Sequence, residues 1–271
     1  MKSDVDKVFA GSIPGIYEEY LVPLIFAFYA EDLAARVAAR APARVLEIAA
    51  GTGVVTRALA TALPASAEIV ATDLNPGMLE TAVRVGTKRP VQWRPADAMK
   101  LPFADAEFDV VVCQFGIMFF PDKHQALAEV RRVLRPGGAF LFNVWDRIED
   151  NELADVVTTS LASVFPADPP RFMARTPHGY HDHAAIAADL RGGGFTTAAQ
   201  ITTLAARSTA PSARNAAIAY CQGTPLRSEI EARDRARLGE ATDFAAAAIE
   251  QRFGAGPVDA KMQAHVVVVE R

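Results

Sequence analysis

The sequence predicts an α/β fold in which a parallel sheet is covered by helices on both faces. Two observations support this prediction. Residues 42–145 alternate short β-branched runs with amphipathic helical windows, and the first of these runs leads directly into a glycine-rich turn followed by a helix. We expect strands at residues 44–49, 68–72, 91–94, 108–113 and 139–145, with two more strand patterns at 195–204 and 265–269.

The helices between these strands carry recognisable start and stop signals. Asn75 and Pro76 predict a helix start, because asparagine favours the N-cap and proline the first helical position. Asp122 and Gln125 predict another start, and the Pro-Gly-Gly sequence at 136–138 is expected to end that helix and turn the chain into the next strand. Further helices are expected at 54–63, 151–164, 183–191 and, with interruptions, 212–253, whereas 165–180 reads as a proline-rich loop.

Length and composition are those of an ordinary globular protein. With 271 residues, 51% hydrophobic and 22% charged, we predict a single domain with an N-terminal helical lid (1–40), a core (41–146) and a C-terminal part with helical insertions (147–271). No apolar run reaches the ~18 residues of a spanning helix and the start lacks a signal-peptide pattern, so we expect a cytoplasmic protein without membrane insertion. A net charge of −4 without a basic cluster argues against nucleic-acid binding.

The glycine turn carries the strongest functional signal. Residues 44–53 read RVLEIAAGTG, in which a strand containing Glu47 runs into Gly51 and Gly53. Glycines let the backbone approach a ligand closely, and the N-terminus of the next helix presents free N–H groups to an anion. Asp73 ends the second strand, where a carboxylate can accept hydrogen bonds from ribose hydroxyls. A dinucleotide and S-adenosylmethionine both satisfy this pattern.

Glu47 separates these two cofactor classes. In a dinucleotide site its carboxylate would repel the doubly anionic pyrophosphate in a region of low dielectric constant. S-adenosylmethionine has no phosphate, and it carries an ammonium and a sulfonium cation, so an acidic residue is tolerated or useful there. A purely local role, in which Glu47 braces neighbouring backbone amides, stays open.

Four motifs in order, between about Val45 and Trp145, resemble those of the class I S-adenosylmethionine-dependent methyltransferases, especially the group similar to the ubiquinone and menaquinone C-methyltransferases. They read VLEIAAGTG, VATDLNPGML, WRPADAMKLPFADAEFDVV and LAEVRRVLRPGGAFLF. The resemblance implies a Rossmann-like three-layer α/β/α sandwich, with a mostly parallel seven-stranded sheet, an antiparallel last strand and helical lid insertions. It departs at Ala49 and Ala50, where the family often has glycine and then a small residue, and the methyl group of Ala49 narrows the approach to the cofactor.

Carried over position by position, the resemblance assigns a cofactor site. Glu47 is similar to the acidic end of the first motif, Gly51 and Gly53 to its ligand-facing turn, and Asp73 to the ribose carboxylate. Asp97, with the backbone of Ala98, is similar to the pair that reads adenine, although from the residues alone Asp97 could equally form a turn. The implied cofactor-binding residues are Tyr20, Glu47, Ala49, Gly51, Thr52, Gly53, Asp73, Leu74, Met78, Asp97, Ala98, Gln114 and Phe115.

The resemblance implies transfer of a methyl group from S-adenosyl-L-methionine to a small organic acceptor, with S-adenosyl-L-homocysteine as the product. Acceptor contacts are expected from residues 1–40, 151–185 and 206–256, in particular from Tyr17 and His178. The cluster PHGYHDH lacks the i, i+4 spacing of a helical metal site, so we expect no metal there and read Asp182 as an N-cap.

Several points stay open at this level. The residues assign no catalytic base, because a base is needed only when the acceptor must lose a proton. A non-catalytic module that binds the same cofactor is one alternative, and an NAD(P)-binding Rossmann protein is a weaker one. The oligomeric state is expected to be a monomer or a homodimer.

Overall fold

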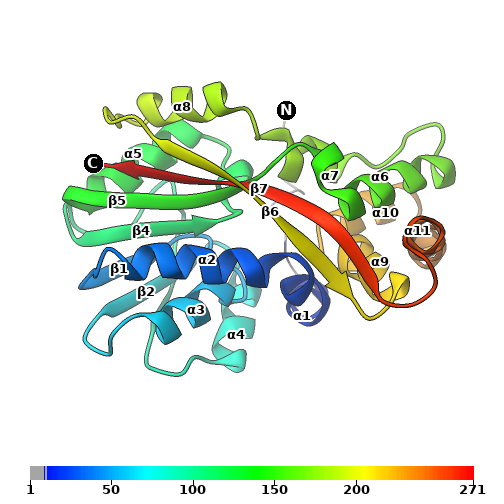
Figure 1. The fold of residues 1–271 in the computed structure, drawn as a ribbon, viewed down its shortest axis with the longest axis horizontal. Helices are drawn as coiled ribbons and strands as arrows, with labels where there is room; N and C mark the ends of the chain where they lie inside the picture. Colours follow the sequence, from blue (N-terminus) through cyan, green and yellow to red (C-terminus); the bar gives the residue numbers. More distant parts are fainter. Residues whose placement is uncertain (1–8, 10) are drawn as a thin grey trace. The chain divides into compact units, whose positions relative to one another are not determined.

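A seven-stranded sheet with the strand order β3-β2-β1-β4-β5-β7-β6 organises the structure, a computed structural model that describes residue 9 and residues 11–271 (Figure 1). Strands β1 to β5 pair in parallel. Strand β7 runs antiparallel to β5, because Gly137 donates to the carbonyl of Arg271 whereas Asp146 donates to that of Gln263. The strands are β1 (Arg44–Glu47), β2 (Glu68–Asp73), β3 (Gln92–Pro95), β4 (Phe108–Gln114), β5 (Leu134–Trp145), β6 (Gln200–Ala210) and β7 (Val258–Glu270). The predicted mostly parallel sheet with an antiparallel last strand is confirmed.

Helices fill the connections between the strands. They are α1 (Ile13–Ile16), the π-helix η2 (Tyr17–Phe26), α2 (Ala27–Ala38), α3 (Val54–Ala62), α4 (Pro76–Val85), η3 (Ile117–Phe119), α5 (Lys123–Val133), η4 (Ile148–Asp150), α6 (Glu152–Val164), α7 (Phe172–Arg175), η5 (Pro177–Gly179), α8 (His183–Gly192), α9 (Ala213–Gln222), α10 (Leu226–Asp234), η6 (Arg235–Arg237) and α11 (Leu238–Phe253). None of these described helices combines the length and apolar composition needed to cross a membrane.

Helix capping follows the sequence signals at two of three predicted starts. The Asp122 side chain accepts a hydrogen bond from the Gln125 N–H at 2.9 Å, and that of Asp182 accepts one from the Ala185 N–H at 2.8 Å, so both predicted caps are confirmed. Asn75 occupies the N-cap position of α4 but makes no side-chain cap. Its amide faces the carboxylate of Asp73 instead, at 3.4 Å.

Several predicted boundaries are wrong, and most of the errors concern pairing partners distant in sequence. The Pro-Gly-Gly sequence lies inside β5, because Gly137 and Gly138 pair with Arg271 near the end of β7. Strand β6 covers 200–210 and not 195–204, and β7 begins at Val258 and not near 265. The predicted loop at 165–180 contains α7 and η5.

The described residues divide into two units. The sheet unit comprises residues 28–144, 180–204 and 264–271, and the helical unit comprises the described residues up to Ala27 together with 145–179 and 205–263. Strands β6 and β7 contribute residues to both. The single domain with divisions after residues 40 and 146 stays a prediction. The chain passes between the two units after residues 27, 144, 179, 204 and 263.

One face of the sheet unit packs against helices α2 and α3. Val45 of β1 lies in register with Ile69 of β2 and Val110 of β4. These side chains form one buried core, which also includes Leu33 of α2 and Leu59 of α3. Side chains two residues apart in a strand lie on the same face of the sheet. The residues that follow these core positions at intervals of two, up to the ends of the strands, therefore also lie on the face covered by α2 and α3. This register determines the candidate site.

The opposite face of the sheet unit is filled by aromatic side chains and by α5 and α8. Phe140 stacks on Phe195, which follows α8, with ring centroids 6.5 Å apart. A Cβ atom on Gly193, at the end of α8, would lie only 2.3 Å from Cβ of Leu127 in α5. The glycines predicted to end this helix therefore also allow the two helices to pack closely.

Candidate functional site

Four polar side chains lie at or near the carboxyl ends of four strands, on the face of the sheet covered by α2 and α3; three of them are the last strand residues, and Asn143 lies two residues before the end of β5. Glu47, Asp73, Gln114 and Asn143 continue the apolar rows of β1, β2, β4 and β5. This is the carboxyl edge, where open α/β sheets bind ligands. Glu47, Asp73 and Asn143 are buried. The site therefore places polar groups at the end of an otherwise apolar core.

The turn after β1 has an unusual backbone conformation and is held by the neighbouring strand. Ala49, Gly51 and Gly53 adopt positive φ angles of 52°, 58° and 84°. The Gly51 N–H donates to Oδ2 of Asp73 at 2.8 Å. A Cβ on Gly53 would lie 2.7 Å from the indole of Trp93, so this side of the turn packs on β3. Any contact of Gly53 with a ligand therefore depends on its backbone atoms.

Glu47 is a buried carboxyl with one hydroxyl donor. The Thr56 hydroxyl donates to its Oε2 at 2.5 Å, and among the described residues Glu47 forms no ion pair. Burial raises the pKa of Glu47 to about 8, against the opposing effects of the Thr56 hydrogen bond and the Arg57 charge. In the same turn, the buried hydroxyl of Thr52 has no hydrogen-bond partner. This combination suits a cationic group that donates hydrogen bonds.

Asp73 connects the turn to the start of α4. Its Oδ1 accepts from the Asn75 N–H at 2.7 Å, while its Oδ2 accepts from Gly51. Burial raises the pKa of Asp73, and these backbone hydrogen bonds oppose that shift. An ionised carboxylate accepts about four hydrogen bonds, and the Asn75 side-chain amide is a third donor at 3.4 Å, so capacity remains for one ligand hydroxyl. The adjacent Leu74 is 55% exposed, whereas Met78 is buried.

Asp97 and Ala98 lie in the loop after β3. Oδ1 of Asp97 accepts from the Met99 N–H at 2.9 Å, and its carbonyl accepts from the Lys100 N–H at 2.9 Å. Asp97 therefore forms the turn that its residue type allowed, and its adenine contact stays a prediction. Arg132 of α5 holds the continuation of this loop by donating to the carbonyl of Phe103 at 2.8 Å.

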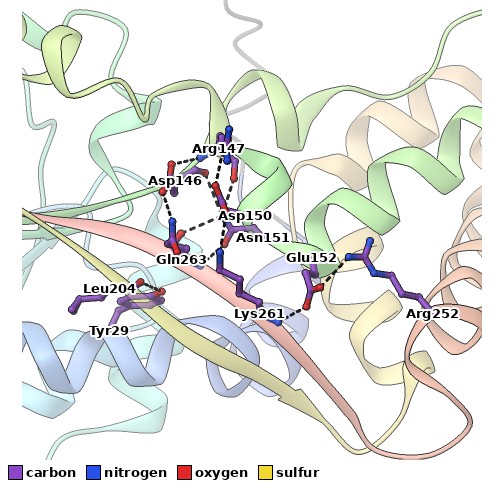
Figure 2. Close-up of polar contacts among 10 residues, drawn as sticks. All are labelled: Tyr29, Asp146, Arg147, Asp150, Asn151, Glu152, Leu204, Arg252, Lys261 and Gln263. Atoms are coloured by element: carbon purple, nitrogen blue, oxygen red, sulfur yellow. Dashed lines mark hydrogen bonds and ion pairs between the residues drawn. The ribbon is translucent and has the colours of Figure 1, made fainter.

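Gln114 and Phe115 follow β4 beside the turn. Phe115 has a positive φ of 51°, and its ring packs edge-on against Tyr29 of α2 at 5.4 Å. The Tyr29 hydroxyl donates to the carbonyl of Leu204 at 3.0 Å (Figure 2). The amide of Asn143 donates to Oε1 of Gln114 at 3.4 Å. Strained backbone at a strand end is typical of functional sites.

Tyr17, Tyr20 and His178 lie in the helical unit, whereas the other predicted site residues lie in the sheet unit. Tyr17 stacks on Phe26 with ring centroids 5.1 Å apart. His178 is buried, and its Nδ1 lies 2.8 Å from the carbonyl oxygen of Asp146. Because a carbonyl only accepts hydrogen bonds, this Nδ1 carries a hydrogen.

A polar network surrounds the carbonyl that His178 contacts. Asn151 donates from Nδ2 to the carbonyls of Arg147 and Gln263, each at 3.1 Å, and accepts from the Gln263 N–H at 3.0 Å. Gln263 in turn donates to the Asp146 carboxylate at 2.7 Å (Figure 2). This network ties the end of β5 to β7 within the helical unit. Its geometry indicates a structural role.

Sequence reasoning missed Thr56, Tyr29 and Asn143. The apolar run FLFNVW carried a signal for Asn143, because a lone amide inside a buried strand needs a partner. Thr56 looked like an ordinary helix residue, and its contact with Glu47 appears only when α3 packs against β1. Tyr29 was recognised only as one of several aromatic residues near the N-terminus.

Comparison with known proteins identifies the same region of the chain. Residues 46–142 match a family model described as a methyltransferase domain. The ubiquinone/menaquinone biosynthesis C-methyltransferase UbiE of Ectopseudomonas mendocina is 35% identical over 165 residues, which cover 56% of this chain and 64% of that protein. The demethylmenaquinone methyltransferase of Deinococcus radiodurans is 44% identical over 107 residues, 39% of this chain and 44% of that protein. The chain thus spans less than two thirds of these relatives.

Solved structures share the fold. A phosphoethanolamine N-methyltransferase of Haemonchus contortus, solved with phosphomonomethylethanolamine and S-adenosylhomocysteine, superposes with a TM-score of 0.61 at 16% identity, covering 98% of this chain and 59% of that one. The protein solved with the Trm112 methyltransferase activator of Haloferax volcanii gives 0.57 at 18% identity, covering 100% and 98%. At these identities the likeness concerns the fold alone.

Proposed function

We propose that this chain, which belongs to the class I S-adenosylmethionine-dependent methyltransferases, transfers a methyl group from S-adenosyl-L-methionine to a small organic acceptor. The observation that carries the proposal is the buried Glu47 at the glycine turn, together with the matched domain at residues 46–142. The named relatives act in ubiquinone and menaquinone biosynthesis, which supports a small-molecule acceptor.

The residues of the sheet unit fit this cofactor. Glu47, which forms no ion pair among the described residues, and the unpartnered hydroxyl of Thr52 suit the ammonium of the methionine end. Asp73 retains acceptor capacity for a ribose hydroxyl, and the exposed side chain of Leu74 offers an apolar surface to a ring. A dinucleotide would bring its pyrophosphate close to Glu47, which disfavours the NAD(P) alternative.

The cofactor, when bound, supplies an already activated methyl group for in-line displacement. The chain then has to bind the cofactor, orient it and exclude water. Glu47 would hold the ammonium of the cofactor and Asp73 its ribose, while Gln114 and Phe115 would border the methyl group. In the helical unit, Tyr17 and His178 are our candidates for acceptor contacts, and Tyr20 for a cofactor contact. We further expect a cytoplasmic monomer or homodimer that does not bind nucleic acid.

Calorimetric titration with S-adenosylhomocysteine tests the cofactor assignment. Asp73→Ala should weaken binding by about 1 to 3 kcal/mol, because it removes hydrogen-bond acceptors. Asp182→Ala is the matched control, since it removes a carboxylate that caps α8 outside the site. Equal affinity in wild type and Asp73→Ala would contradict the ribose assignment, and binding of NAD(H) in place of S-adenosylhomocysteine would contradict the cofactor itself.

Turnover needs a separate experiment. We expect transfer of a labelled methyl group from S-adenosylmethionine to at least one compound in a panel of small metabolites. Binding of S-adenosylhomocysteine without transfer to any acceptor in a broad panel would favour the non-catalytic alternative.

A further inference from the structure

We propose that Glu47 is protonated in the free protein and gives up this proton when the ammonium of the cofactor binds, so that binding exchanges a proton for a cation. The inference deepens the proposed function and rests on it, because it concerns the same ligand at the same site. It identifies Glu47 as the residue that selects a positively charged ligand.

The surroundings of Glu47 favour the neutral carboxyl. The residue is 1% exposed, and the Thr56 hydroxyl at 2.5 Å is the one hydrogen-bond partner of its carboxyl group among the described residues. No ion pair compensates a negative charge there within the described part of the chain. A buried carboxylate without a cation is so unfavourable that such groups generally take up a proton.

The charged and titratable neighbours support this assignment. On β2, Asp73 would repel a second negative charge, while on α3 the Arg57 guanidinium favours ionisation but donates to the Thr52 carbonyl at 2.7 Å. On β4, burial raises the pKa of the Cys113 thiol to about 12, so this group is neutral and adds no cation. Burial outweighs the Arg57 charge, and the pKa of Glu47 rises to about 8.

Hydrogen-bond donors decide which of the two neighbouring acids keeps its charge. The carboxylate of Asp73 accepts from the backbone N–H groups of Gly51 and Asn75 at 2.8 Å and 2.7 Å, and such donors stabilise an anion. Glu47 has instead the Thr56 hydroxyl as its partner, and a hydroxyl can either donate to a carboxylate or accept from a carboxyl group. When the environments of two acids separate their pKa values in this way, the proton belongs to the acid with fewer hydrogen-bond donors, which here is Glu47.

An incoming ammonium changes this balance. It supplies the missing positive charge and N–H donors, and the unpartnered hydroxyl of Thr52 offers it a second acceptor in the same turn. The O–H bond of the Glu47 carboxyl breaks, its proton passes to the buffer, and the carboxylate pairs with the ammonium. Net charge is conserved, because one cation enters the site as one proton leaves.

Proton release can be measured by titrating S-adenosylhomocysteine into the protein in two buffers of different ionisation enthalpy. At pH 7 we expect about 0.9 protons released per ligand bound in the wild type, falling as the pH rises through 8. Glu47→Gln should release none. The matched control Asp73→Asn should still release a proton, because that proton comes from Glu47. The neutral fragment 5′-methylthioadenosine, which lacks the amino acid end, should bind without proton release.

The outcomes separate this inference from the proposed function. If S-adenosylhomocysteine does not bind to the wild type, the proposed function fails. If it binds to the wild type without releasing a proton, the function stands and the exchange is refuted. Release that disappears in Asp73→Asn but persists in Glu47→Gln would assign the proton to Asp73 and also overturn the inference. If Glu47→Gln does not bind S-adenosylhomocysteine at all, the proton release of the wild type across the pH series and that of Asp73→Asn still test whether the proton comes from Glu47.

Discussion

The buried carboxyl of Glu47 should make the free protein lose stability as the pH rises above about 5, and Glu47→Gln should abolish this loss. In the unfolded chain the group has its ordinary pKa of 4.5, whereas burial raises it to about 8 in the folded state. Between these values the folded state binds more protons than the unfolded state. The stability is therefore fully present below pH 4.5 and falls progressively up to about pH 8.

The size of the effect follows from the two pKa values. One pH unit is equivalent to about 1.4 kcal/mol for a single proton, so the free energy of unfolding should fall by roughly 2 to 3 kcal/mol between pH 5 and pH 7. Glutamine resembles the protonated carboxyl in size and polarity but does not titrate. The Glu47→Gln variant should lack this decrease while all other titrating groups contribute equally to both proteins.

Urea denaturation at pH 5, 6, 7 and 8 measures the difference. The sheet unit contains Trp93, whereas Trp145 belongs to the helical unit, so a Trp145→Phe background makes fluorescence report on the unit that contains Glu47. A difference between the two proteins that stays constant from pH 5 to pH 7 would refute the reasoning. It would mean that Glu47 ionises in the folded protein as it does in the unfolded chain.

Three further substitutions test the packing around the site. Gly53→Ala should lower the free energy of unfolding by about 3 kcal/mol, because the new Cβ atom would lie 2.7 Å from the Trp93 ring at a residue with a positive φ angle. Gly86 has a similar φ angle but open space around it, so Gly86→Ala should cost only about 1 to 2 kcal/mol. Urea unfolding measures both losses. Gly116→Ala should destabilise because its Cβ would lie 2.6 Å from that of Ala49, and adding Ala49→Gly should recover part of the loss; additive effects in the double mutant would contradict the contact. Asn151→Ala should cost about 1 to 3 kcal/mol, seen in Trp145 fluorescence, because it removes the acceptor of the Gln263 N–H and one donor to each of the carbonyls of Arg147 and Gln263; a loss below about 0.5 kcal/mol would mean that water replaces the amide.

Local chemistry explains which predictions succeeded. The strand, glycine turn and helix over residues 44–62 depend on contacts close in sequence, as do the caps made by Asp122 and Asp182. Strands β6 and β7 were misplaced because their extent depends on pairing across a large sequence separation. The Pro-Gly-Gly sequence was read as a turn, since nothing local shows that Gly137 and Gly138 pair with Arg271.

By itself, the sequence determined the fold class, the order of the motifs and the identity of the acids at the ends of β1 and β2. Only the tertiary structure decided that Glu47 and Asp73 share one face with Gln114 and Asn143, because that depends on the register of four separate strands. It also decided the protonation of Glu47. The pKa of a carboxyl depends on how completely its neighbours exclude water, and those neighbours meet only when the chain has folded.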